Sequence, residues 1–154
     1  MFLASMRFDL GEDVQALQDA VHRFSQDRIR PLAGEIDRSN QFPDALWQEL
    51  GQMGLLGITI SGAHGGAEMG YLAHTVAIEE IARASASVAL SYGAHSNLCV
   101  NQISLNGTEE QKQKYLPSWC RGTILEPWRC QNLQRDLMWF QCSYARKNET
   151  VTIG

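Results

Sequence analysis

The residues of this sequence whose side chains could do chemistry begin with its four histidines. They stand at His22, His64, His74 and His95. No two of them are separated by three or four positions, the offsets that bring two ligands onto one helix face. The spacing of the histidines therefore does not favour a helical bundle that binds heme or a metal ion. His22 lies next to an apolar stripe, and we interpret it as structural or exposed rather than catalytic.

Cysteines are the second candidate for chemistry, and three of the four lie in the last quarter, at Cys120, Cys130 and Cys142. Zinc sites use close pairs such as C-x2-C, and these spacings are much wider, so no metal site is predicted. A disulfide framework is the conventional interpretation of clustered cysteines in secreted proteins. The N-terminus, MFLASMRFDLGEDV, is a poor signal peptide and gives no support to that interpretation.

A glycine-rich stretch, LLGITISGAHGGAEMG, could in principle cradle a phosphate with Gly65, Gly66 and Gly70. It does not match the dinucleotide pattern G-x-G-x-x-G, and it does not end in the Lys-Ser/Thr of a P-loop. A backbone turn between two helices is the interpretation that the sequence favours.

Apolar residues at helical spacing predict the elements that position these residues. Residues 12–36 predict an amphipathic helix that Pro31 interrupts, because proline lacks an N–H donor. A second helix is expected from about Asp44, and Gly54 is placed to end it.

The chain is organised around residues 71–106, which predict two consecutive helices with a break at residues 84–87, where serines favour caps. Few charges interrupt the second of these helices, so we expect most of its sides to be buried. Thr108 and Gln111 form a T-x-x-Q capping box that starts a further helix, expected to stop at Pro117.

Composition changes at Pro117. Residues 1–117 hold 8 Lys+Arg against 14 Asp+Glu and predict a compact all-α unit of about five helices, whereas residues 118–154 hold 5 against 3 and three of the four tryptophans. The net charge of −4 argues against nucleic-acid binding. No apolar run reaches the roughly 18 to 20 residues that span a bilayer, and we expect a cytoplasmic chain without a membrane partner.

Four stretches resemble the acyl-CoA dehydrogenase family, in the order of that family. They are EIDRSNQFP (35–43), GLLGITISGAHGGAEMGYL (54–72), VALSYGAHSNLCVNQI (88–103) and NGTEEQKQKYLP (106–117). The run LSYGAHSNLC resembles the branch of the family that oxidises isovaleryl-CoA in leucine catabolism. Residues 61–67, SGAHGGA, depart from the family's usual PxxYGGxG.

The resemblance implies an N-terminal helical domain, a middle β-barrel and a C-terminal helical domain, in a homotetramer that binds FAD and an acyl-CoA substrate. A glutamate outside these 154 residues takes the α-proton while a hydride passes to the flavin, so no catalytic, metal-binding or cofactor-binding residue is expected here. By the resemblance, Leu90 and Ala94 face the acyl chain, and their spacing puts them on one helix face. The alternative is that both are ordinary core residues.

After KYLP the resemblance stops, where the family continues toward a flavin-contacting motif like A-M-S-E-P-x-A-G-S-D. Codons for Ser118 onward, read two bases later, give Leu-Val-Ser-Gly-Asp-His, and those from Arg129 give Met-Ser-Glu-Pro-Ala-Ala-Gly-Ser-Asp. We interpret residues 118–154 as translated out of frame and expect an irregular, poorly ordered tail.

Together these observations predict a truncated acyl-CoA dehydrogenase-like chain that supplies only part of the acyl pocket. Alone it is expected to bind no FAD and to be inactive. A helical interaction module without catalysis is the alternative. Helices without their partner domains expose apolar stripes, so self-association is expected.

Overall fold

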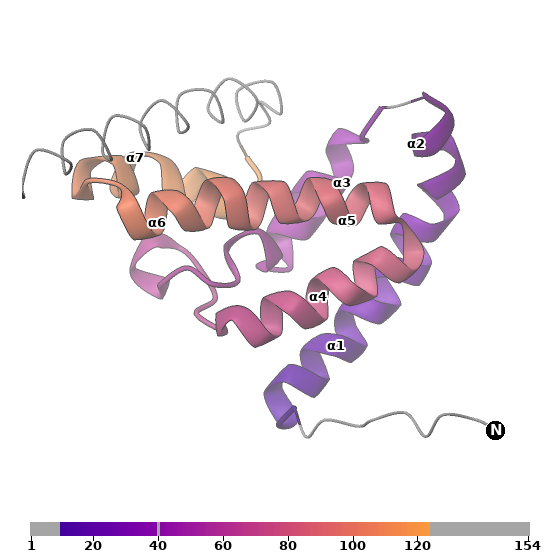
Figure 1. Cartoon of the computed structure of the whole chain (residues 1–154), viewed down its shortest axis with the longest axis horizontal. Helices are drawn as coiled ribbons and strands as arrows, with labels where there is room; N and C mark the ends of the chain where they lie inside the picture. Colours follow the sequence, from indigo (N-terminus) through magenta and orange to yellow (C-terminus); the bar gives the residue numbers. More distant parts are fainter. Residues whose placement is uncertain (1–9, 40, 124–154) are drawn as a thin grey trace, which may run out of the picture.

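The computed structural model describes residues 10–39 and 41–123, and the regular elements of that part of the chain are helical (Figure 1). The α-helices are α1 (Glu12–Phe24), α2 (Ala33–Ser39), α3 (Asp44–Gln52), α4 (Gly70–Ala84), α5 (Ala86–Gly93), α6 (Gln102–Asn106) and α7 (Glu109–Cys120). Between them lie the π-helical segments η1 (Ser25–Ile29) and η5 (Ala94–Asn101) and the 3-10 turns η2 (Arg30–Leu32), η3 (Leu55–Gly57) and η4 (Gly62–His64). The all-α prediction is confirmed. No helix among these residues combines the length and the apolar character needed to cross a membrane.

The first helical rod runs from α1 to α2 and changes its geometry before Pro31, as predicted. Five residues of π-helix, Ser25–Ile29, lead into the 3-10 turn that contains the proline. Proline cannot donate to the carbonyl four residues earlier, so the regular hydrogen-bond pattern has to change around it. Val21 and Ile29 are fully buried on either side of this change, so the rod keeps one face on the core.

The break between α4 and α5 lies at Ser85, inside the range predicted. Its backbone is extended, and its hydroxyl accepts a hydrogen bond from the amide of Val88. A serine at this position satisfies one of the free amides at the start of the new helix. The chain therefore turns here, and Figure 1 shows α5 and α6 continuing beyond it as one rod.

The expected helix end at Pro117 is wrong, because α7 continues through it to Cys120. Trp119 and Cys120 are 9% and 2% exposed and lie in a core cluster. A proline inside a helix costs about 3 kcal/mol, and burying two such side chains returns a comparable amount. The helix ends at Cys120, and Gly122 follows it with a φ of 63°, which suits glycine. Beyond residues 118–123, the expected tail lies outside the described residues.

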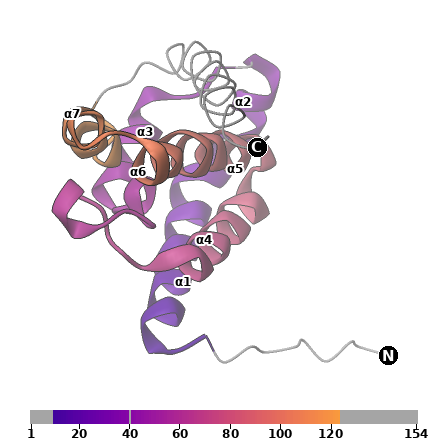
Figure 2. The same cartoon turned by 60° about the vertical axis from the view of Figure 1, so that its left-hand side comes forward.

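Two apolar clusters form the core. The larger one joins α1, α3, η3, α4 and α5, with Leu50, Leu55 and Ile81 fully buried in it. The smaller one joins η5, α6 and α7 around Val100 and Leu116. Figure 2 shows how the helices lie, with α1 running behind α4 and α6 beside α7. The rod made by α5, η5 and α6 contributes to both clusters, and it also carries the predicted site residues.

Candidate functional site

Leu90 and Ala94, the two residues expected to face an acyl chain, occupy consecutive turns of the central rod. Leu90 lies in α5, and Ala94 is the first residue of the π-helical segment η5. The side chain of Leu90 is 77% exposed, and Ala94 is partly buried. Leu90 is therefore not a core residue of the described part of the chain.

The opposite side of this rod is fixed to the core by polar contacts. The Tyr92 hydroxyl donates to the backbone oxygen of Leu55 over 3.1 Å, and the Ser96 hydroxyl donates to the backbone oxygen of Tyr92 over 2.8 Å. His74 Nε2 lies 2.7 Å from the Ser96 hydroxyl. Burial raises the pKa of Tyr92 and lowers the pKa of His74, so both side chains are held neutral. These contacts fix the orientation of the rod about its own axis. Leu90, on the other side of the rod, therefore points away from the core.

The π-helical geometry of η5 also affects which residues line up along the rod. Eight residues of α-helix overshoot two full turns by about 80°. A π-helix hydrogen-bonds from i to i+5 and so turns less per residue, which brings Leu98 closer to the line of Leu90. Segments of π-helix are frequent at functional sites.

Leu90, Leu98 and Leu105, which we call the leucine face, are 77%, 49% and 61% exposed. They recur at offsets of eight and seven, close to two helical turns each. No aspartate, glutamate, lysine or arginine occurs between Arg83 and Glu109. The leucine face is thus suited to an apolar group and carries no acid or base. The long uncharged run predicts that most sides of this helix are buried against something, and the described residues do not cover the leucine face.

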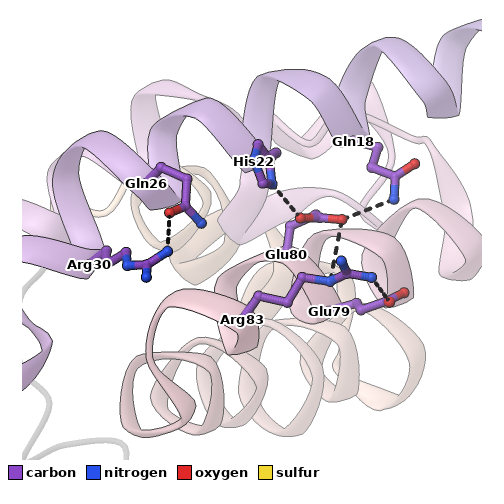
Figure 3. Close-up of polar contacts among 7 residues, drawn as sticks. All are labelled: Gln18, His22, Gln26, Arg30, Glu79, Glu80 and Arg83. Atoms are coloured by element: carbon purple, nitrogen blue, oxygen red, sulfur yellow. Dashed lines mark hydrogen bonds and ion pairs between the residues drawn. The ribbon is translucent and has the colours of Figure 1, made fainter.

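A cluster of polar side chains joins α1 to α4 (Figure 3). It does not include the residues of the leucine face. Glu80, 3% exposed, accepts a hydrogen bond from Gln18 Nε2 and lies against His22 Nδ1, each over 2.9 Å. Arg83 Nε is 3.8 Å from the same carboxylate. Burial alone would raise the pKa of Glu80, but the contacts with His22, Gln18 and Arg83 outweigh it and hold this pKa below its usual value. The cluster joins two helices, and both oxygens of the Glu80 carboxylate are paired with its side chains.

The remaining histidines lie in other places. His64 Nε2 is 3.1 Å from Glu109 Oε1, and His95 Nε2 is 3.3 Å from the backbone oxygen of Trp119. Residues 10–39 and 41–123 contain no group of three or more histidine, cysteine or acidic side chains that could hold a metal ion.

The glycine-rich stretch is a backbone turn, as the sequence favoured. The amides of Gly65 and Gly66 donate to Gly62 and Ser61, and that of Ala67 donates to Gly57. A Cβ at position 66 would lie 2.1 Å from the backbone oxygen of Ile60, so only glycine fits there. These amides bond within the loop, which leaves them unavailable to a phosphate.

The comparisons with known proteins agree with this architecture. Residues 11–123 match the model of the acyl-CoA dehydrogenase N-terminal domain. Over 123 residues, 79% of this chain and 29% of the relative, the chain is 50% identical to mitochondrial isovaleryl-CoA dehydrogenase of Solanum tuberosum. It is 47% identical to mitochondrial 2-methylacyl-CoA dehydrogenase of the same plant over 73% of this chain and 28% of the relative.

A solved structure gives the same result. Butyryl-CoA dehydrogenase of Megasphaera elsdenii superimposes with a TM-score of 0.69 and 31% identity, over 77% of this chain and 32% of that one. The chain therefore spans less than a third of the length of the relatives it matches.

Proposed function

The chain belongs to the acyl-CoA dehydrogenase family through its N-terminal domain, and on this premise we propose that it supplies one wall of an acyl pocket. The substrate class is a short branched acyl-CoA, with isovaleryl-CoA as the first choice. The support for this choice is the similarity to two dehydrogenases named for branched acyl groups. Leu90 and Ala94 are the residues assigned to the acyl chain.

The observation that carries the proposal is the exposure of Leu90 on a rod fixed from behind. An apolar side chain that is 77% exposed, on a helix without charges, is poorly matched to water. Ala94, one turn further on, has a short side chain and leaves room beside it. A leucine that limits the depth of a pocket and an alanine that widens it act as a shape filter, worth about 1–3 kcal/mol per methylene excluded.

FAD is the cofactor of the family, and we propose that the described residues alone do not hold it. The glycine-loop amides bond within the loop. Among residues 10–39 and 41–123, the buried side-chain polar atom left without a hydrogen bond is the hydroxyl of Ser25, at the start of η1. A flavin is held by several polar groups that converge in one pocket. We infer that the 154-residue chain alone binds no FAD and oxidises no acyl-CoA.

A chimaera tests the pocket assignment directly. Residues 11–117 of this chain would replace the corresponding segment of the potato isovaleryl-CoA dehydrogenase, which then supplies every other part of the enzyme. We expect the chimaera to oxidise isovaleryl-CoA with an acceptor dye. A folded, flavin-containing chimaera that shows no preference for branched over straight short acyl-CoA would overturn the assignment.

The absorbance spectrum of the 154-residue chain tests whether it binds FAD, and the nucleotide sequence of its gene tests the reading frame. We expect no stoichiometric yellow chromophore after purification and no electron transfer from isovaleryl-CoA to a dye. The translation of residues 118–154 out of frame is part of the proposal, and sequencing the gene from the Lys114 codon onward tests it. An intact codon series shared by related proteins would defeat it.

A helical interaction module is the second candidate, and the exposed leucine face is the observation that favours it. A pull-down with the full chain separates a module that binds a defined protein from one that binds nothing. The cytoplasmic location also stays a prediction, since the two potato relatives are named mitochondrial proteins. Fractionation of cells that produce the chain would decide it.

A further inference from the structure

The leucine face is a long apolar surface for which the described residues provide no cover. Leu90, Leu98 and Leu105 stand along the rod from Ala86 to Asn106, which at 1.5 Å per residue is about 30 Å long. Figure 1 shows this rod extended across the molecule. Exposed apolar surface of this kind is costly in water and tends to be covered by a partner or by another part of the chain.

The described chain ends close to the middle of that rod. Gly122 lies so near α3 that a Cβ added to it would be 2.5 Å from the backbone oxygen of Trp47. The ring of Trp47 is 5.1 Å from the ring of His95, which lies in η5 between Leu90 and Leu98 in sequence. Residues 124–154 therefore begin next to the helix that carries the leucine face.

The segment that follows is long enough to reach every part of the face. Leu133 lies ten positions after Thr123, and an extended chain of that length spans up to about 33 Å. This is about the length of the whole rod. Leu133 and the residues after it are thus within reach of Leu90 at one end and Leu105 at the other.

The sequence of this segment has the chemistry that the leucine face requires. Leu133, Leu137, Phe140 and Tyr144 recur at offsets of four, three and four, the spacing of one apolar helix side. The charge balance is also favourable. Residues 124–154 hold 4 Lys+Arg against 3 Asp+Glu, whereas residues 10–123 hold 8 against 13, so the two parts carry net charges of opposite sign.

We propose that residues 133–144 dock on the leucine face of the same polypeptide. A tethered segment has an effective concentration in the millimolar range, so it competes well against a second copy of the chain. This proposal differs from two expectations drawn from the sequence, a poorly ordered tail and self-association of the chain. It also covers Leu90, the residue that the proposed function assigns to the acyl chain, so the segment and an acyl group exclude each other.

The experiment measures how accessible the leucine face is in the full chain. A Leu98→Cys reporter is modified with a maleimide, and the rate at position 98 is read from peptides by mass spectrometry and divided by its rate in the urea-unfolded chain. Arg38→Cys, on α2, is the control reporter because the Arg38 side chain is 79% exposed. We expect position 98 to react about tenfold more slowly than position 38, as protected sites do.

The segment is then changed while each reporter is kept. Leu137→Glu with Phe140→Glu should raise the rate at position 98 to that at position 38. Gln131→Glu with Gln134→Glu adds the same charge off the apolar side and should leave position 98 protected. Carbene footprinting of Leu90, Leu98 and Leu105 in the unsubstituted chain repeats the test without a reporter.

Three results would overturn the docking. They are equal rates at positions 98 and 38, protection that survives the Leu137 and Phe140 substitutions, and protection that grows with protein concentration, which indicates a second copy. The chimaera that tests the proposed function contains no residue beyond 117, so either proposal can fail without the other.

Discussion

The Nδ1 atom of His22 lies 2.9 Å from Oε2 of Glu80, and this contact joins α1 to α4 across 58 positions of sequence. The two side chains differ in environment, since that of His22 is 51% exposed and that of Glu80 only 4%. The buried carboxylate is thus reached from the solvent side by its partner. The strength of the contact depends on Glu80 keeping its charge.

Replacing Glu80 with glutamine should destabilise the chain. Glu80→Gln removes the charge that His22 and Arg83 face while keeping the size of the side chain. Because both partners are more than half exposed, we expect a loss of about 1–2 kcal/mol in the free energy of unfolding, measured with urea. Glu79→Gln is the control, since its pair with Arg83 is exposed, and it should change stability by less than about 0.5 kcal/mol.

The effect of Glu80 should also depend on pH. Its pKa is lower in the folded chain than the ordinary value of 4.5. The unfolded state therefore binds a proton first as the pH falls, so the stabilisation is complete above 4.5 and is lost as the pH drops through the folded value. Urea unfolding at neutral and acidic pH should show the gap between the parent chain and Glu80→Gln closing in acid. A gap that widens there would contradict the assignment.

Position 57 should not tolerate a side chain. A Cβ at Gly57 would lie 2.5 Å from Cys120 Sγ and 2.8 Å from Cys120 Cβ, so Gly57→Ala forces η3 and α7 apart. We expect a loss of about 1–3 kcal/mol in the thermal or urea unfolding free energy. Gly34→Ala in α2 meets no atom within 4 Å and should be neutral or stabilising. Equal effects of the two substitutions would show that α7 does not press on η3.

Trp119 tests whether the residues after Pro117 belong to the packed unit. Its ring is 5.4 Å from that of Tyr115, and the side chain is 9% exposed. Trp119→Ala should cost about 3–5 kcal/mol of unfolding free energy, as expected for a large aromatic side chain in a core. Ser118→Ala, its neighbour on a partly buried site, removes one hydroxyl and should cost far less. A negligible effect of Trp119→Ala would place the end of the unit at Pro117.

Ala94 should set the width of the acyl pocket in the chimaera. Ala94→Leu adds bulk beside Leu90, so kcat/KM for isovaleryl-CoA should fall by about 10- to 100-fold, while a straight short acyl-CoA is affected less. Ala86→Leu is the matched control, because position 86 is exposed at the start of α5. If both substitutions reduce kcat/KM equally for both substrates, Ala94 does not line the pocket.

Local signals in the sequence were sufficient to predict the helix starts. The Thr108 amide donates to Gln111 Oε1 over 2.8 Å, and the Gln111 amide donates to Thr108 Oγ1 over 3.3 Å, which is the capping box predicted from four residues. The break before α5 is similar, since the Ser85 hydroxyl caps an amide three residues away. Such contacts depend on neighbours in the chain, so the sequence contains all the information they need.

Contacts between distant residues were not predictable in the same way. Whether α7 continues past Pro117 depends on the burial of Trp119 and Cys120, and Cys120 packs against Gly57, which is far away in sequence. The outward direction of Leu90 depends on Tyr92 being anchored to Leu55. A leucine at helical spacing looks the same in a sequence whether its side chain meets the core or solvent, so the pattern alone could not separate the two.

The continuation of α7 through Pro117 has a consequence for how the gene can be interpreted. If the change of reading frame is confirmed, the first codons after it encode Trp119 and Cys120, whose side chains are buried. The domain would then have accepted a tryptophan and a cysteine into its packing by accident of nucleotide order. A changed reading frame at this position would be compatible with the fold only if the residues at positions 119 and 120 can be buried.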